Sequence, residues 1–394
     1  MSGIFIVAAK RTPFGKFGGS LKKKTITDLS EIALKAALAQ AGLSAEHVSS
    51  TVVGNVCPVT SKEGIYSARH TALRCGVPLE RPAYMINRLC GSGFQSVVNA
   101  AQEIMLGDSS IVAAGGVENM SQYPYVIRDA RFGIPFGTVP PLEDSLWGGL
   151  EDQHVKMPMA ITAENLADMH GITREECDAY AIQSQQRWGA AQQAGRFAEE
   201  IVPIPMKTKK GVVELTVDEH PRPDVTPAGM AKLPPVFKKN GVVTAANASG
   251  ICDGAGMLIV ASEAACNEHG LTPLARLVNY SVAGVCPTVM GRGPTPAIEQ
   301  VLDKSGLSLS DIGLVDVNEA FAAQFLAVSK ELGLDNEISN VNGGAIAIGH
   351  PLAASGSRIT ANLIYEMRHR NVQYGIGSAC IGGGQGIALL LEKC

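Results

Sequence analysis

Two kinds of apolar pattern alternate along the chain and predict an α/β protein. Short continuous apolar runs, such as SIVAAGG (110–116) and GLVDVNE (313–319), are typical of strands buried on both faces. Between such runs lie longer segments with apolar residues at three-and-four spacing, which predict amphipathic helices. This alternation favours a mixed sheet covered by helices on both faces.

One predicted helix has an unusual start, NRLCGSGF, in which Cys90 precedes Gly91-Ser92-Gly93. Glycine costs a helix about 1 kcal/mol against alanine, so we expect the two glycines to let a carbonyl group approach the backbone N–H groups there. The simpler alternative is that Cys90 is a small buried apolar residue. The predicted buried face of this helix comprises Phe94, Val97, Val98, Ala101, Ile104 and Met105.

The two ends of the chain repeat one order of elements. The helix, Gly-Leu-Ser turn and strand around Gly42 recur around Gly306, and the same offset carries Gly115-Gly116 onto Ala379-Cys380. Nearly the same offset sets Gly93 against Gly356. We therefore predict a duplication, with a first half (1–120 plus 250–272) and a second half (273–394).

The segment between the halves, the insert (121–249), differs in composition. It is rich in prolines and charges and holds Trp147 and Trp188, the only two tryptophans, together with a clear helix over TREECDAYAIQSQQRWGAAQQAG. We expect an inserted cap or loop domain.

Length and charge narrow the possible functions. At 394 residues the chain should form two or three domains. With 33 basic and 37 acidic residues, nothing points to nucleic acid, and no apolar run reaches the roughly 18 residues of a membrane span.

The nine cysteines, an odd number without a CxxC pair or a secretory signal, predict reduced thiols and no metal site. Phosphate-loop, dinucleotide and Gly-x-Ser-x-Gly motifs are absent, which argues against a bound nicotinamide or a serine nucleophile.

Three further glycine-flanked loops carry reactive groups: DVNEAFA with Asn318, GHPLAASGS with His350, and GSACIGGGQG with Cys380. Paired halves would bring Cys90, His350 and Cys380 to one cleft. A helix start and an imidazole would lower the pKa of Cys90, making it a nucleophile for an acyl group. A second thiol suits a separate proton transfer at an α-carbon.

Each candidate also has an ordinary structural alternative. His350 could be a buried histidine, Cys380 a small core residue, and Asn318 the cap of a helix beginning near Ala320.

Six blocks, spread in order over nearly the whole chain, resemble the signature blocks of the thiolases. They are NRLCGSGFQS, GGVENMSQYP, NASGICDGAG, DVNEAFA, NGGAIAIGHPLAASGSR and GSACIGGGQGIALLLE. The resemblance implies a five-layered α-β-α-β-α sandwich of two duplicated halves. The insert segments EDSLWGGLEDQHVKMPMAITAENLA and VDEHPRPDV resemble most the mitochondrial 3-ketoacyl-coenzyme A branch.

The resemblance also implies roles for individual residues. Cys90 takes the acyl group, His350 activates it and, with a water held by Asn318, forms one oxyanion hole, and Cys380 is the acid/base. The backbone N–H groups of Cys90 and Gly382 form a second hole. The implied coenzyme contacts are Arg222, Ser249, Phe237 and Met159.

The implied activity is thiolysis of 3-ketoacyl-coenzyme A in fatty acid β-oxidation, with coenzyme A as a substrate and no permanently bound cofactor. The alternatives are an acetyl-coenzyme A acetyltransferase and, more remotely, a non-catalytic acyl-coenzyme A binding protein. A homodimer or homotetramer is implied as well.

The branch implies the mitochondrial matrix rather than the cytoplasm. The first 24 residues hold six basic residues and no acid, which is compatible with a targeting start; these are Lys10, Arg11, Lys16, Lys22, Lys23 and Lys24.

Three sites depart from the family pattern, namely Ala353-Ala354, Val225 and Ala246. Ala353-Ala354 replace residues that are usually glycine, and would be strained if the turn needed a positive φ. Val225 replaces a common hydroxyl residue and Ala246 a common glycine, so we expect changed affinity.

Overall fold

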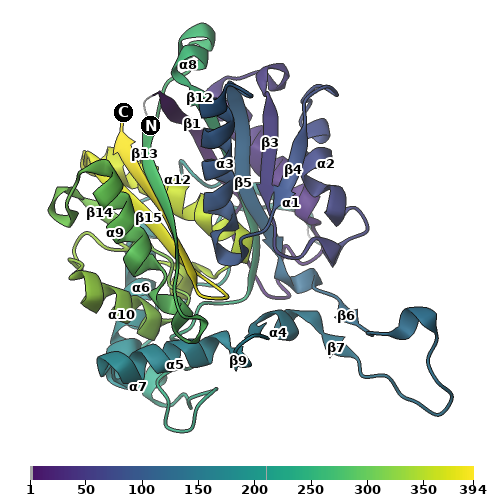
Figure 1. Cartoon of the computed structure of the whole chain (residues 1–394), viewed down its shortest axis with the longest axis vertical. Helices are drawn as coiled ribbons and strands as arrows, with labels where there is room; N and C mark the ends of the chain where they lie inside the picture. The colour runs from purple at the N-terminus through teal and green to yellow at the C-terminus, as the bar shows by residue number, and fades with distance from the viewer. Residues whose placement is uncertain (1–2, 210) are drawn as a thin grey trace.

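In the computed structural model, which describes residues 3–209 and 211–394, two related sets of strands meet at the centre of one sheet. The sheet order is β14-β15-β16-β13-β1-β12-β5-β3-β4. β1 and β13 pair only through Phe5–Arg276 and Ile6–Ala275, so the two sets join at a narrow seam (Figure 1). The pairs β3–β4, β3–β5 and β14–β15 are parallel, which makes the sheet mixed, as predicted.

The first set comprises β1 (Ile4–Arg11), β12 (Cys252–Ser262), β5 (Ile111–Asn119), β3 (Ser50–Gly54) and β4 (Ala83–Ile86). The second set comprises β13 (Ala275–Gly284), β16 (Gln385–Lys393), β15 (Tyr374–Ile381) and β14 (Leu314–Val317).

The helices repeat in the same way as the strands. α1 (Ile26–Ala41) leads into β3 as α9 (Pro294–Ser305) leads into β14, and α3 (Ser92–Leu106) leads into β5 as α12 (Ser355–Arg370) leads into β15. α1 and α9 both end at a glycine in the left-handed region, Gly42 at φ 62° and Gly306 at φ 66°. The predicted internal duplication is therefore present in the fold.

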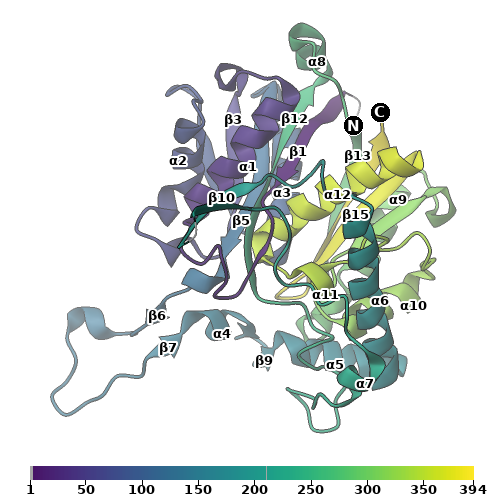
Figure 2. The ribbon, with the colours of Figure 1, turned by 180° about the vertical axis from the view of Figure 1, so that it is seen from behind.

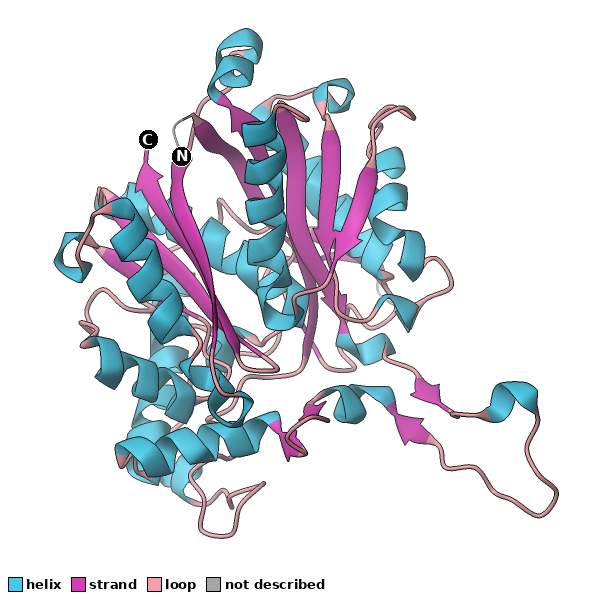
Figure 3. Ribbon diagram, in the orientation of Figure 1, coloured by secondary structure: helices cyan, strands magenta, loops and turns pink. Residues whose placement is uncertain are grey.

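Five layers result from this repeat. α3 and α12 lie between the two strand sets, and their apolar faces share one core with β5 and β16. α1 and α2 (Ser67–Arg74) cover the outer face of the first set, whereas α9 and α10 (Ala322–Leu332) cover that of the second (Figures 1 and 3). The α-β-α-β-α sandwich is confirmed.

The glycines at the start of α3 lie in close contact with the second half. A Cβ on Gly93 would lie 2.6 Å from the Ala353 carbonyl oxygen, and one on Gly356 would lie 2.2 Å from the Phe94 nitrogen. A Cβ on Gly91 would lie 2.5 Å from Ile381 Cδ1. Gly93 and Gly356 therefore let the two central helix starts pack backbone against backbone, and Gly91 leaves room for the Ile381 side chain. The expected approach of a carbonyl group to the N–H groups at this helix start stays a prediction.

The prediction that Met105 belongs to the buried face of α3 was wrong. Met105 is 48% exposed, because it lies in the last turn of the helix beyond the edge of the core.

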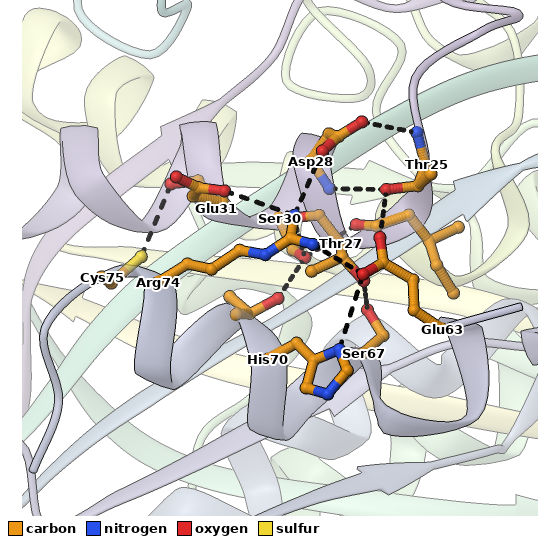
Figure 4. Close-up of polar contacts among 12 residues, drawn as sticks. Thr25, Thr27, Asp28, Ser30, Glu31, Glu63, Ser67, His70, Arg74 and Cys75 are labelled. Atoms are coloured by element: carbon orange, nitrogen blue, oxygen red, sulfur yellow. Dashed lines mark hydrogen bonds and ion pairs between the residues drawn. The ribbon is translucent and has the colours of Figure 1, made fainter. Parts of the chain in front are cut away.

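The outer helix pair α1–α2 is joined by charged side chains at its exposed rim (Figure 4). Arg74 of α2 lies 3.2 Å from Asp28, 3.6 Å from Glu31 and 2.6 Å from Glu63. Asp28 also completes a capping box with Thr25 at the start of α1. This network holds the outer helix layer over β3. It lies away from the candidate site.

The insert packs against both halves, with helices on the core of the second set and a strand, Ile204–Thr208, on the core of the first. It contains α4 (Ser145–Gly149), α5 (Met159–His170), α6 (Arg174–Gln193), α7 (Pro227–Ala231) and the hairpin β10–β11 (Ile204–Thr208, Gly211–Leu215). The predicted insert helix is α6. The short strands β6 (Tyr125–Val126) and β7 (Glu143–Asp144) begin an arm that projects away from the sandwich (Figures 1 and 2). β12 and α8 (Glu263–His269) then complete the first half.

Candidate active site

Cys90 lies in a 3₁₀ turn, η4 (Leu89–Gly91), directly before α3. The preceding residue, Leu89, has φ 46°, a conformation that non-glycine residues rarely adopt. Its N–H donates to Asn87 Oδ1 at 2.9 Å and its carbonyl accepts from Ser92 Oγ at 2.7 Å. These contacts hold a strained turn, as is common where a side chain must be presented for reaction.

The Cys90 side chain is half-buried among Met120, Leu146 and Leu352. Burial raises the pKa of its thiol to about 11, although hydrogen bonds from the backbone N–H groups of Gly382 and Cys90 favour the thiolate. The expectation of a lowered pKa was therefore wrong, because desolvation outweighs the helix start. Cys90 rests as a thiol and needs a base when it reacts.

We expect His350 to be that base. Burial lowers the pKa of its imidazole to about 3, so the ring is neutral at physiological pH. Nδ1 lies 2.6 Å from Ser355 Oγ, and this hydroxyl donates to the Pro351 carbonyl at 3.3 Å. Nδ1–H is therefore the donor to Ser355, and Nε2 carries the lone pair.

Asn318 lies at the end of β14, beside the imidazole. Its Nδ2 donates to His350 Nε2 at 3.4 Å, while its Oδ1 is buried without a protein partner. Asn318 does not cap α10, which begins at Ala322 after Phe321, so that alternative was wrong. A buried oxygen without a partner beside a catalytic base suits a bound water.

Cys380 and Gly382 come from the end of β15 and the following turn. Burial and the nearby Cys90 both raise the pKa of the Cys380 thiol, so the two thiols lie in one site. A Cβ on Gly382 would lie 3.1 Å from Leu89 Cδ1 and 3.6 Å from Met159 Sδ. Met159 also packs with Cys380. The fold therefore brings Cys90, Cys380, Gly382 and Met159 together.

Of two other predicted coenzyme residues, Ser249 borders the loop of His350 and Arg222 lies on the surface. The Ser249 N–H donates to the Ala320 carbonyl at 3.0 Å, and the next residue, Gly250, accepts from the His350 N–H at 2.8 Å. Arg222 is exposed, and its Nη1 donates only to the carbonyls of His220 and Pro221. No acid pairs with its guanidinium within the described ranges.

Phe237 is less closely connected to the site. It lies on the surface of the insert, 37% exposed, and no contact in the described part of the chain brings it to the two sulfurs.

The comparisons with known proteins agree with this geometry. Residues 4–264 match the thiolase N-terminal domain and residues 271–393 the thiolase C-terminal domain. The chain belongs to the thiolase family. It is 60% identical to the mitochondrial 3-ketoacyl-CoA thiolase of Bos taurus, with 100% of this chain and 99% of that protein covered. It is 47% identical to an acetyl-CoA acetyltransferase of Cupriavidus necator, with 100% of both chains covered.

Solved thiolase structures match as closely. The crystal structure of human mitochondrial 3-ketoacyl-CoA thiolase superposes with a TM-score of 0.98 at 59% identity, covering 100% of this chain and 99% of that one. Its complex with CoA gives a TM-score of 0.97 at 58% identity, covering 100% and 98%. The resemblance seen in the six sequence blocks is confirmed, and the branch with 3-ketoacyl-CoA thiolases is favoured over the acetyltransferases.

The departures from the thiolase pattern cause no backbone strain. Ala353 and Ala354 lie in a 3₁₀ turn, η9 (Leu352–Ala354), and neither has a positive φ. Val225 and Ala246 pack their side chains against the core around α6 and α10. Their substitutions therefore add apolar contacts where the family pattern expects a hydroxyl group or a glycine.

Two residues of this thiolase site were missed in the sequence. Ser355 orients His350 from five residues further along, and only its position in the GHPLAASGS loop could have indicated it. Glu118 is the carboxylate of the buried strand β5, whose other residues are apolar residues, glycines and one asparagine. An acidic residue inside a fully buried strand is itself a signal.

Proposed function

We propose that this thiolase cleaves 3-ketoacyl-CoA to acetyl-CoA and a shortened acyl-CoA through an acyl group carried on Cys90. The observation that carries the proposal is the meeting of two thiols, Cys90 and Cys380, at a turn whose Gly382 N–H faces the Cys90 sulfur. One thiol is enough for simple hydrolysis, whereas breaking a carbon–carbon bond also needs a group that protonates the departing carbon.

In the first step, Cys90 Sγ attacks the 3-keto carbon and its proton passes to His350 Nε2. The C2–C3 bond breaks, acetyl-CoA leaves as an enolate, and Cys380 protonates its C2. The negative charge that develops on the thioester oxygen is stabilised by His350 and a water on Asn318. The charge that develops on the oxygen of the acyl-enzyme is stabilised by the N–H groups of Cys90 and Gly382.

In the second step, a free coenzyme A thiol attacks the acyl group on Cys90. The incoming thiol restores the proton that Cys380 gave up, and His350 returns its proton to the departing Cys90 sulfur. Because the acyl group stays a thioester throughout, the exchange needs no ATP.

We further propose that the insert supplies the coenzyme contacts. The positive Arg222, without an acidic partner in the described residues, suits the nucleotide phosphates. Met159, beside Gly382, suits the end of the pantetheine arm, with Ser249 and Phe237 further along.

The same insert is proposed to join subunits into a homodimer or homotetramer. Its projecting arm exposes Phe132, Phe136 and Val139 almost completely, and such apolar groups suit a contact with another subunit. The names of the mitochondrial relatives support a location in the matrix. No helix within residues 3–209 and 211–394 is long and apolar enough to cross a membrane.

The deciding experiment is Cys90→Ala, measured by thiolysis of a medium-chain 3-ketoacyl-CoA and by labelling with [14C]acetyl-CoA followed by digestion. We expect thiolysis to fall by at least about a thousandfold and the label to disappear from the peptide that holds residue 90. Thiolysis that survives the change would exclude the mechanism. Rates on acetoacetyl-CoA against longer 3-ketoacyl substrates separate the acetyltransferase alternative, and a complete lack of turnover would favour the binding-protein alternative.

A further inference from the structure

Glu118, a carboxylate to which the proposed reaction assigns no step, lies near Cys90. It is fully buried near the end of β5, a strand in which every residue is buried. No cation contributes to its surroundings among the residues that the structure describes. A buried charge without a counter-ion is costly unless hydrogen bonds satisfy it.

Five donors from three separate segments satisfy this carboxylate. The segments are the loop after β3, the 3₁₀ turn after β5 and the turn η9 of the second half. Oε1 accepts from Asn55 Nδ2 at 3.1 Å, Cys57 N at 3.2 Å and Tyr123 Oη at 3.0 Å, and Oε2 accepts from Val56 N at 3.1 Å and Ala353 N at 3.3 Å.

The same three segments form the wall around the nucleophile. Val56, Tyr123 and Leu352 pack with Cys90 in one apolar cluster. The Val56 carbonyl also accepts from Asn87 Nδ2 at 3.2 Å, and Asn87 Oδ1 in turn holds the strained Leu89. A continuous path of contacts therefore runs from Glu118 to the Cys90 turn.

The path also reaches the base. Ala353, bonded to Glu118, lies two residues before Ser355, whose hydroxyl accepts from His350 Nδ1. We propose that Glu118 is a positioning residue that fastens the Cys90 turn of the first half to the His350 loop of the second half. This inference rests on the proposed thiolase function and extends it to a residue outside the reacting groups.

The charge of Glu118 makes the inference testable. The titratable groups that face it are Cys57, Cys90 and Tyr123. Burial raises the pKa of Glu118 to about 7, while its hydrogen bonds, that of Tyr123 included, lower it. Protonation of Glu118 near neutral pH would place an O–H group among five hydrogen-bond donors. This would loosen the contact between the Cys90 turn and the His350 loop. Ionised Glu118 in turn raises the pKa of Cys90.

The first test is Glu118→Gln, because glutamine keeps the shape but turns an NH₂ group toward donors. We expect kcat for thiolysis to fall about 10- to 100-fold, with KM for coenzyme A unchanged. Alkylation of Cys90 by iodoacetamide, followed against pH by peptide mass, should show its midpoint at lower pH. A purely structural role would not move that midpoint.

The matched control is Glu164→Gln, another buried carboxylate, which accepts the N–H groups of Val242 and Val243 at 2.9 and 2.8 Å. It should leave the alkylation midpoint of Cys90 in place.

The second test is Tyr123→Phe, which keeps the carboxylate and the ring and removes one donor. Loss of this hydrogen bond raises the pKa of Glu118, so the fall of kcat on the acid side should begin at higher pH. A kcat of Glu118→Gln equal to that of the wild type overturns the inference. The inference is also overturned if the alkylation midpoint of Glu118→Gln and the acid limb of Tyr123→Phe are both the same as in the wild type. If Glu118→Gln does not fold, the acid limb of Tyr123→Phe decides alone. Absence of thiolysis in the unaltered protein would instead count against the proposed function, and the alkylation midpoint of Glu118→Gln would then decide the inference.

Discussion

Proton positions at Cys90 and His350 decide how the reaction can begin. The burial that raises the Cys90 pKa also lowers the His350 pKa, so the resting pair is a thiol and a neutral imidazole. A neutral Nε2 can accept the thiol proton only when the sulfur attacks. In the proposed reaction the thiolate therefore forms only as the sulfur attacks.

The two thiols should be separable by mutation. Cys380→Ser keeps the size of the side chain but raises the pKa of the acid far above that of a thiol, so proton transfer at C2 should fail. We expect 3-ketoacyl-CoA cleavage to fall about a hundredfold or more, as for loss of a general acid, while acylation of Cys90 by acetyl-CoA persists. Single-turnover labelling and steady-state thiolysis measure the two steps.

The control for this prediction is the equivalent change at Cys394, an exposed thiol after β16. Cys394→Ser should leave both steps unchanged. Equal loss of acylation and cleavage in Cys380→Ser would contradict the assigned acid/base role.

At this scale, sequence indicated the reactive residues but not their surroundings. Cys90, His350 and Cys380 are visible because rare side chains lie in glycine-rich loops. Ser355 and Glu118 act through hydrogen bonds whose partners are distant in the chain, such as Ala353, 235 residues from Glu118. The pKa of Cys90 was misjudged for the same reason, because desolvation depends on packing that a local motif does not reveal.

At the scale of elements, backbone contact between α3 and α12 unites the halves. Gly93 and Gly356 mark equivalent positions in the repeat and lie against each other, as the short distances from their hypothetical Cβ atoms show. Both helices begin just after proposed catalytic residues: η4, with Cys90, precedes α3, and η9, which follows His350, precedes α12. Close packing here therefore sets the distance between Cys90 and His350.

Gly93→Ala should disrupt this contact. Its Cβ would meet the Ala353 carbonyl oxygen at 2.6 Å and the Ser357 nitrogen at 2.7 Å, both of them backbone atoms that cannot rotate away. We expect a loss of about 1–3 kcal/mol in the free energy of unfolding, with a larger proportional loss of kcat. Urea denaturation and thiolysis rates measure the two effects.

Gly284→Ala is the matched control, since nothing lies within 4 Å of its hypothetical Cβ and its φ is not positive. It should be close to neutral. Unchanged stability and rate in Gly93→Ala would show that the helix starts can separate without cost.

Most elements could be predicted, because the repeat, the helix caps and the apolar runs are local signals. The sandwich itself came from the family resemblance, and the narrow seam between β1 and β13 has no signature in either strand. The insert was recognised by composition, yet its projecting arm was not, because a segment rich in proline and glycine does not specify its direction.

At the scale of the molecule, one buried ionic cluster joins the three parts of the chain. Arg11 of β1 lies 2.7 Å from Glu200 and 2.6 Å from Asp218, both in the insert, and all three side chains are fully buried. Glu200 also accepts from Asn362 of α12 at 3.4 Å. Burial opposes the charge of Arg11, but Asp218 and Glu200 outweigh it and raise its pKa. The basic start of the chain is thus partly structural.

Arg11→Leu should show how strongly the insert depends on this cluster. The change leaves two buried carboxylates without their cation, so we expect a loss of about 3–5 kcal/mol at pH 8. The pKa of Glu200 is already raised by burial, with Arg11 opposing the shift; without Arg11 it rises further. The folded variant then binds protons more tightly than its unfolded state, so its stability must increase as the pH falls toward 5. In urea denaturation, the difference in free energy of unfolding between the variant and the wild type should be smaller at pH 5 than at pH 8. An equal difference at both pH values would show that the lost contact is one of packing rather than of charge.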